Sequence, residues 1–80
     1  MEEIYYFSSS TCGPCKSMKP VVDKLIKEGK KIIKFDVVKD SLKTIEFDIV
    51  SVPTFIKLNS NFEEEKRAVG LMNINQLREF

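Results

Sequence analysis

The only two cysteines of the chain stand two residues apart, in Thr11-Cys12-Gly13-Pro14-Cys15-Lys16. They follow a continuously apolar run, residues 4–7, which predicts a strand covered on both faces. They precede apolar residues at helical spacing, which predict a helix. Two close cysteines between a strand and the start of a helix predict a thiol site, because that position favours the reactive thiolate.

Length and composition predict one compact domain, residues 1–80, since half of this length would bury too little apolar surface. The chain is 42% hydrophobic and 31% charged, an ordinary balance for a globular protein. Its 13 basic and 12 acidic residues are scattered and leave a net charge of +1, so nucleic acid is not an expected partner. The acidic start and the short apolar run after it predict no signal peptide and no membrane segment. We expect a cytoplasmic monomer.

The numbers of cysteines and histidines limit the kinds of catalytic and metal sites that the chain can form. The chain has two cysteines and no histidine, which excludes a Cys-His or Ser-His pair and leaves a metal site two ligands short. No metal is therefore expected. A purely structural disulfide across so short a loop would stabilise the fold little. Redox chemistry of the cysteine pair is the interpretation that we favour.

The pattern of apolar residues and turn residues predicts the order β-α-β-α-β-β-α, an α/β fold with a four-stranded mixed sheet and three helices. The expected strands are residues 4–7, 31–38, 54–58 and 62–69, and the expected helices begin near Cys15, at Asp40 or Ser41, and after Asn73. The first two strands form a right-handed parallel crossover, and the last two form an antiparallel hairpin.

Several local features are predicted within these elements. The hydroxyls of residues 8–11 are candidates to cap the first helix, and Pro20 should kink it. The charged run Glu63–Arg67 is interpreted as a solvated edge strand rather than a docking patch. The helical residues expected to face the core are Met18, Val21, Val22, Leu25 and Ile26 in the first helix, Leu42, Ile45 and Ile49 in the second, and Ile74, Leu77 and Phe80 in the third.

The spacing of the two cysteines also predicts separate roles. Cys12, at the exposed tip of the helix, should be the attacking nucleophile, because helix N–H groups stabilise its thiolate. Cys15, one turn further in, should be the buried resolving thiol. Gly13 permits close approach of a partner, Pro14 suits the first helical turn, and Lys16 is a candidate for further thiolate stabilisation.

The sequence resembles the thioredoxin family. The residues that carry the resemblance are Cys12-Gly13-Pro14-Cys15-Lys16, Pro20, Val52-Pro53-Thr54, Val69-Gly70 and the C-terminal run Gln76–Phe80. The resemblance implies a thioredoxin fold and a reductase of protein disulfides that cycles between a Cys12/Cys15 dithiol and disulfide. It also implies no tightly bound cofactor, with electrons supplied by NADPH through thioredoxin reductase.

The resemblance assigns further residues to substrate binding. It implies a cis peptide bond between Val52 and Pro53, with the Val52 backbone beside Cys12 to pair with an extended substrate segment. Gly70 would complete this docking surface. Thr11 lies on the same surface, where the family usually carries a tryptophan.

Other departures from the family lie beneath the cysteines and in the length of the chain. Tyr6 aligns with a buried aspartate that is thought to help deprotonate the resolving cysteine, and Lys34 aligns with a lysine near that aspartate. Without the acid, Cys15 is expected to pass its proton to water or to the departing substrate thiol. The chain also lacks the first strand and helix of full thioredoxins, as glutaredoxins do.

Two alternative functions remain open from the sequence. One is a glutaredoxin-like electron donor recycled by glutathione, for example one that serves ribonucleotide reductase. The other is a non-catalytic subunit that uses the fold only for binding. We favour thioredoxin-like activity, because Gly70-Leu71-Met72-Asn73 does not reproduce the region associated with glutathione binding.

Overall fold

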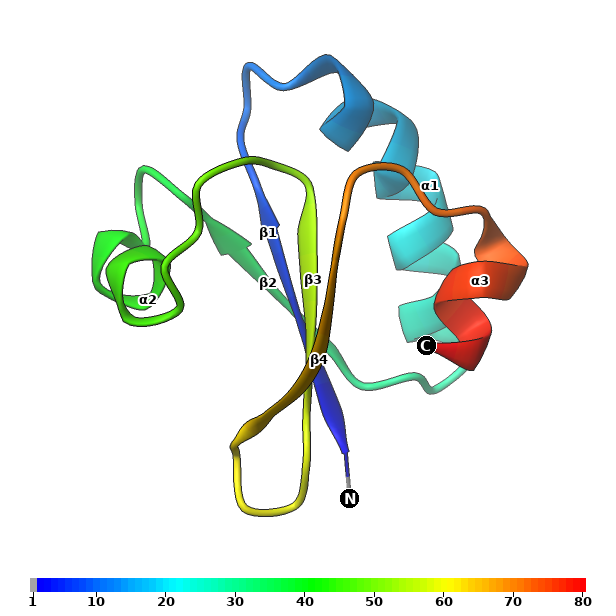
Figure 1. Cartoon of the computed structure of the whole chain (residues 1–80). Helices are drawn as coiled ribbons and strands as arrows, with labels where there is room; N and C mark the ends of the chain where they lie inside the picture. The colour runs from blue at the N-terminus through cyan, green and yellow to red at the C-terminus, as the bar shows by residue number, and fades with distance from the viewer. Residues whose placement is uncertain (1) are drawn as a thin grey trace.

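The computed structural model describes residues 2–80; Met1, which the predicted domain includes, lies outside the described residues. The predicted order of elements is confirmed (Figure 1). The elements are β1 (Glu3–Ser8), α1 (Gly13–Lys27), β2 (Ile32–Asp36), α2 (Ser41–Glu46), β3 (Thr54–Leu58), β4 (Glu64–Val69) and α3 (Ile74–Glu79).

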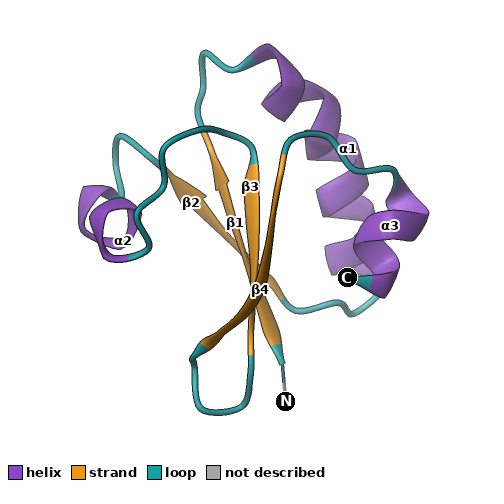
Figure 2. Cartoon of the chain, viewed as in Figure 1, coloured by secondary structure: helices purple, strands orange, loops and turns teal. Residues whose placement is uncertain are grey.

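The strands form one mixed sheet in the order β2-β1-β3-β4 (Figure 2). β1 pairs in parallel with β2, with Ile4 opposite Ile32, as the predicted crossover requires. β3 lies antiparallel to both β1 and β4. The apolar run that precedes the cysteines is therefore a central strand, which explains why residues on both of its faces are apolar.

The two faces of the sheet are covered by different helices. α1 and α3 lie on one face and α2 lies on the other (Figure 1). On the α1 and α3 face, the core includes Tyr6, Met18 and Leu77. On the α2 face, Tyr5 and Phe7 pack in a second cluster. Since side chains alternate along a strand, the consecutive residues Tyr5 and Tyr6 belong to opposite faces.

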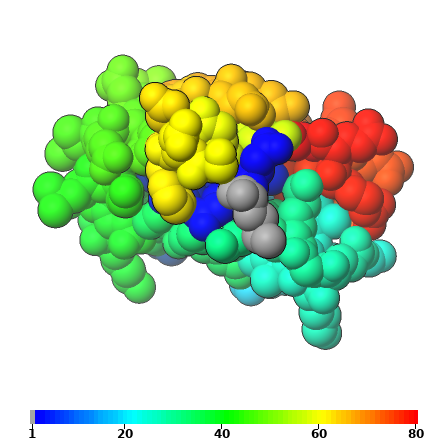
Figure 3. All heavy atoms as spheres, turned by 90° about the horizontal axis from the view of Figure 1, so that it is seen from below, coloured from blue at the N-terminus to red at the C-terminus, as the bar shows by residue number. Residues whose placement is uncertain are grey.

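The two ends of β1 mark the two ends of the sheet. Its carboxyl end leads into α1, and the loops that precede β3 and follow β4 lie at that same end of the sheet (Figure 1). Figure 3 shows the opposite end, where the β3–β4 turn (yellow) lies beside the start of β1 (blue). Ion pairs are found at this end, including Lys31 with Glu3 at 3.0 Å and Lys57 with Glu2 at 3.1 Å.

Three of the four strands differ from their predicted ranges. β1 extends one residue further at each end, from Glu3 to Ser8, and β2 begins at Ile32 rather than at residue 31. β2 ends at Asp36 rather than at residue 38, because the Asp36 carboxylate accepts hydrogen bonds from the N–H groups of Val38 and Lys39 and so forms a turn. β4 begins at Glu64 rather than at residue 62. There the Asn59 side chain accepts a hydrogen bond from the Glu63 N–H at 3.1 Å, which holds the turn.

The predicted inner face of α2 is wrong for two of its three residues. Leu42 and Ile45 are 83% and 75% exposed. Ile49, beyond the end of the helix, packs against the second core cluster as predicted, together with Phe47. The Phe47 ring lies 5.5 Å from the Tyr5 ring, edge to face. Phe47 and Ile49 attach this segment to the sheet, and Leu42 and Ile45 of α2 consequently face outward.

The other two helices follow the prediction more closely. In α1, Met18, Val22 and Leu25 are buried, and the helix continues through Pro20. Ile26, which was predicted to face the core, is 37% exposed. α3 begins after Asn73, as predicted, and Asn73 and Gln76 form a capping box with reciprocal hydrogen bonds of 2.8 Å. Leu77 is buried, and Ile74 and Phe80 pack beside it.

Candidate active site

The first helix begins at the cysteines themselves. Its N-cap is Cys12, not one of the hydroxyl residues 8–11, and its first residue is Gly13 rather than Cys15. The Cys12 sulfur accepts a hydrogen bond from the backbone N–H of Cys15 at 3.1 Å. A sulfur in the capping position takes the role of the expected hydroxyl. Pro14 lies in the first turn, where its missing N–H costs no hydrogen bond.

The serines that precede Cys12 shape the loop instead. The Ser9 hydroxyl lies 3.1 Å from the Thr11 hydroxyl, and it accepts a hydrogen bond from the Thr11 N–H at 3.3 Å. The Cys12 N–H donates to the Ser9 carbonyl at 3.2 Å. These contacts form a turn that leads from β1 to the N-cap.

Cys12 and Cys15 form a disulfide, with their Cα atoms 5.2 Å apart. Cys12 is half-buried, whereas Cys15 is only 5% exposed. Thr11, Gly13, Pro14 and Lys16 are all exposed around them. Cys12 is therefore accessible to a partner, and Cys15 lies beneath it.

Main-chain groups from two distant loops surround Cys12. The Val52–Pro53 peptide bond is cis, as the family resemblance implies. The Cys12 sulfur lies 3.8 Å from the Val52 carbonyl oxygen. The Gly70 N–H donates to the Pro53 carbonyl at 2.8 Å, and Gly70 has φ +99°, a conformation that favours glycine. The structure thus brings together Cys12, Val52, Pro53 and Gly70.

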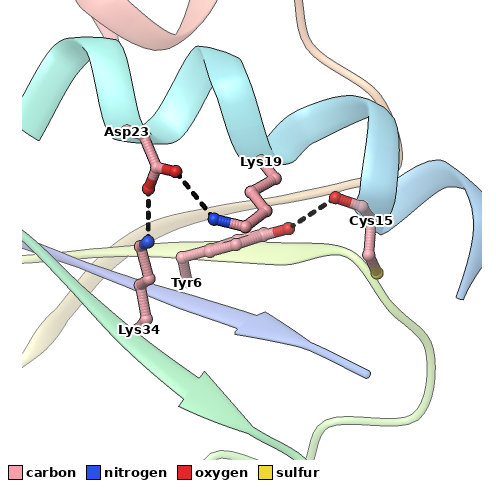
Figure 4. Close-up of polar contacts among 5 residues, drawn as sticks. All are labelled: Tyr6, Cys15, Lys19, Asp23 and Lys34. Carbon is pink, nitrogen blue, oxygen red and sulfur yellow. Dashed lines mark hydrogen bonds and ion pairs between the residues drawn. The ribbon is translucent and has the colours of Figure 1, made fainter. Parts of the chain in front are cut away.

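Side chains, by contrast, lie beneath Cys15. Tyr6 of β1 is 4% exposed, and its hydroxyl donates a long hydrogen bond of 3.4 Å to the Cys15 carbonyl (Figure 4). The Tyr6 ring stacks on Phe55 of β3, with ring centroids 4.8 Å apart. Burial raises the pKa of the Tyr6 hydroxyl, so the phenol is neutral at physiological pH.

An ion-paired cluster lies next to Tyr6. Asp23 of α1 binds both Lys34 of β2 and Lys19, the latter at 3.0 Å (Figure 4). The Lys34 hydrogen bond, followed by that of Lys19, lowers the pKa of the Asp23 carboxyl. The family resemblance left Lys34 without its acidic partner, and sequence reasoning did not predict that Asp23 would pair with it. Only the spacing of Lys19 and Asp23, four residues apart, indicated part of this cluster.

A cavity of about 250 Å³ opens beside Cys15, and the sequence did not predict it. It is lined by Tyr6, Ser8, Ser9, Ser10, Cys15, Lys16, Lys19, Lys34 and Asp36. Eight of these nine residues carry a hydroxyl or a charged group, although most of the surface that they expose to the cavity is apolar. The serine run and Lys16, which sequence reasoning assigned to helix capping and to thiolate stabilisation, thus contribute polar groups to this cavity.

Residues 2–80 contain neither a membrane-spanning helix nor a cluster of metal-binding side chains. None of the helices described there is long and apolar enough to cross a membrane. Three histidine, cysteine or acidic side chains that could jointly hold a metal ion are also not found within that range.

A cysteine pair that caps a helix, with one residue accessible and the other buried beside a proline loop, defines the site of a thiol-disulfide oxidoreductase. Comparison with known proteins gives the family. The thioredoxin family model matches residues 2–80. The chain therefore belongs to the thioredoxin family, whose activity is the reduction of protein disulfides.

Individual relatives agree with this assignment. The chain is 34% identical to the thioredoxin of Rickettsia felis over 74 residues, which cover 89% of this chain and 70% of that protein. It is 32% identical to the thioredoxin of Bacillus subtilis over 76 residues, which cover 91% of this chain and 72% of that protein.

Solved structures show the same fold. A mutant thioredoxin from Halobacterium salinarum matches with a TM-score of 0.87 and 25% identity, over 98% of this chain and 69% of that one. Fasciola hepatica thioredoxin matches with a TM-score of 0.86 and 29% identity, over 98% of this chain and 75% of that one. The predicted thioredoxin fold is confirmed.

Proposed function

We propose that the chain reduces protein disulfides with Cys12 as the nucleophile and Cys15 as the resolving thiol. The observation that carries this assignment is the hydrogen bond from the Cys15 N–H to the Cys12 sulfur, 3.1 Å long. In the reduced protein the same N–H can donate to a Cys12 thiolate, the form that attacks a disulfide. Cys15 is 5% exposed and therefore cannot be the first to meet a protein substrate.

The reaction has two displacement steps. The Cys12 thiolate attacks one sulfur of the substrate disulfide and forms a mixed disulfide, while the other substrate sulfur leaves as a thiolate and takes up a proton. The Cys15 thiol loses its proton and attacks the Cys12 sulfur. The Cys12–Cys15 disulfide forms, the second substrate thiolate leaves, and two electrons have passed from the protein to the substrate.

The main-chain groups near Cys12 support a binding role. Val52 carries its carbonyl 3.8 Å from the Cys12 sulfur, so an extended substrate segment that pairs with the Val52 backbone places its own sulfur near Cys12. Thr11 and Gly70 form the rest of this surface. The Pro53 side chain is fully buried, and Pro53 contributes through its carbonyl, which accepts the Gly70 N–H at 2.8 Å. A Cβ at Gly13 would meet nothing within 4 Å, which leaves room for a partner backbone. Lys16 adds positive charge close to the reacting thiols.

The oxidised protein needs an electron donor, and we assign this role to NADPH acting through thioredoxin reductase. The thioredoxin relatives support this donor over glutathione. A dithiol reductant works in a reducing compartment, which favours the cytoplasm, and we expect the protein to act as a monomer. Neither the glutaredoxin-like alternative nor a purely binding role is favoured by these relatives.

Reduction of insulin with dithiothreitol as the electron source tests the assignment of the cysteines. Cys12→Ser should abolish catalysis, because a hydroxyl does not attack a disulfide at neutral pH. Cys15→Ser should still attack but should accumulate mixed disulfides on Cys12, and the captured proteins would identify the substrates. A Cys12→Ser, Cys15→Ser double variant is the matched control and should capture nothing. Undiminished catalysis by Cys12→Ser would contradict the proposal.

Coupled assays then separate the electron donors. Thioredoxin reductase with NADPH should reduce the protein faster than glutathione with glutathione reductase. The opposite order would support the glutaredoxin-like alternative.

A further inference from the structure

The buried side of the disulfide is organised around an uncharged group. Tyr6 lies directly beneath the first turn of α1 and donates its hydroxyl to the Cys15 carbonyl at 3.4 Å (Figure 4). Its stacking on Phe55 fixes the ring, since the two planes are 17° apart. Removal of the hydroxyl alone would therefore leave the ring in place and remove this contact with the Cys15 carbonyl.

The charged groups around Tyr6 come from two elements. They are Lys16, Lys19 and Asp23 from α1, and Lys34 and Asp36 from β2. β3 presents only the Phe55 ring to Tyr6. Asp23 is held as a carboxylate by two lysines, and Asp36 by the backbone N–H groups of Lys39 and Val38, each with a lowered pKa. Neither acid exchanges a proton near neutral pH.

The cavity supplies a different route for protons. Its volume of about 250 Å³ and its lining of Tyr6, Ser8, Ser9 and Lys34 provide the space and the polar partners that water requires. Cys15 lines the same cavity. Solvent that enters this cavity therefore meets Cys15 as well as Tyr6.

We propose that Tyr6 is a positioning residue for the resolving step: its neutral hydroxyl holds the Cys15 main chain at the edge of this cavity, where the Cys15 thiol releases its proton to solvent. The inference rests on the proposed roles of the two cysteines. In the resolving step the S–H bond of Cys15 breaks and solvent takes the proton. The sulfur electron pair forms the bond to the Cys12 sulfur as the S–S bond between Cys12 and the substrate breaks, and the substrate leaves as a thiolate. The Tyr6 O–H bond stays intact throughout.

Stopped-flow reaction of the reduced protein with an aromatic disulfide, dithiobis(nitrobenzoate), separates the two steps. Attack by Cys12 releases the first coloured thiolate, and resolution by Cys15 releases the second. Tyr6→Phe should slow the second release about fivefold, the equivalent of one ordinary hydrogen bond, and leave the first within about twofold. Because the phenol acts in its neutral form, this ratio should be constant from about pH 6 to about pH 9.

Tyr5→Phe is the matched control. Tyr5 is 8% exposed on the other face of the sheet, against Phe35 and Phe47, so its hydroxyl is remote from the cysteines. This variant should leave both releases unchanged. Thermal unfolding of both variants checks that each is folded.

Three outcomes would overturn the inference. If the second release in Tyr6→Phe equalled that in Tyr5→Phe, the hydroxyl would have no positioning role. If the ratio to the unmodified protein varied with pH, Tyr6 would itself exchange a proton. If the unmodified protein released only one thiolate, the resolving role of Cys15 would fail, and the failure would then lie in the proposed function.

Discussion

The two sulfurs of the active site lie in contrasting surroundings. Near Cys12 the contacts are made by main-chain groups, the N–H of Cys15 and the carbonyl of Val52. Near Cys15 they are made by side chains, the Tyr6 hydroxyl and the residues that line the cavity. The proposed substrate side of the site, around Cys12, is thus formed by main-chain contacts, whereas the buried side, around Cys15, is formed by side chains.

This contrast has a physical consequence. Backbone groups are present whatever the side chains are, so the substrate side tolerates substitutions that keep the loops in place. Buried side chains have no such freedom, because each one fills space and satisfies a specific polar group. The substrate side should accept new side chains with little loss of stability, and the buried side should not.

The largest expected effect comes from placing the same new charge on either side. Tyr6→Asp puts a carboxylate at a position that is 4% exposed and removes the ring that stacks on Phe55, so it should lower the free energy of unfolding by at least about 3 kcal/mol. Thr11→Asp, at an exposed position, should change it by less than about 0.5 kcal/mol. Urea denaturation measures both, and equal losses would abolish the contrast.

A smaller effect is expected from a matched pair of glycines. Gly70 and Gly29 have φ of +99° and +100°, and a Cβ at either would meet nothing within 4 Å. Gly70→Ala and Gly29→Ala should therefore each cost about 1 kcal/mol of stability, from backbone conformation alone.

Only Gly70 lies beside Pro53, through its hydrogen bond of 2.8 Å. Gly70→Ala should therefore also slow insulin reduction, by about threefold, whereas Gly29→Ala should not. If both variants reduced insulin equally fast, Gly70 would have no part in the substrate surface.

The contrast between main-chain contacts near Cys12 and side-chain contacts near Cys15 also explains how much of the site the sequence could predict. The Cys12–Cys15 disulfide, the cis Val52–Pro53 bond and the position of Gly70 beside Pro53 agree with the resemblance, because the local conformation of these segments depends on their own glycine and proline residues. The pairing of Asp23 with Lys34 was not predicted. It depends on how closely α1 docks on β2, and helical or strand periodicity contains no information about that distance.

Two local errors have related causes. A run of hydroxyl residues favours helix capping in general, but the cap is set by which residue precedes the first helical turn, and that residue is Cys12. The outward position of Leu42 and Ile45 arises because the six-residue α2 is too short for its own periodicity to decide its orientation. Phe47, which contacts Tyr5 and Phe7, decides it instead.

A gain of function on the substrate side should follow from Thr11→Trp. An exposed aromatic ring beside Cys12 adds apolar contact with a bound protein and should lower KM for insulin about threefold. Stability should change by less than about 0.5 kcal/mol, since Thr11 is exposed. Thr11→Ala is the control for loss of the hydroxyl contact with Ser9. An unchanged KM in Thr11→Trp would show that partners do not contact this position.

The smallest effect concerns Asp23, at the edge of the buried side. The hydrogen bonds from Lys34 and Lys19 lower its pKa in the folded protein below the usual value of 3.8. Its contribution to stability is therefore complete above the unfolded-state pKa and is lost as the pH falls through the folded one. Because the Asp23 side chain is 41% exposed, solvent screening limits this contribution to about 0.5 kcal/mol.

Asp23→Asn should accordingly be less stable than the unmodified protein at pH 7, and the difference should vanish near pH 2, about two units below the usual pKa of an aspartate. Other carboxylates titrate equally in both proteins, so the difference between their urea denaturation curves isolates Asp23. A difference that persisted undiminished in acid would mean that Asp23 stabilises the fold through packing rather than charge. A loss of several kcal/mol at pH 7 would place it with Tyr6 among the buried groups beneath Cys15, rather than at their solvated edge.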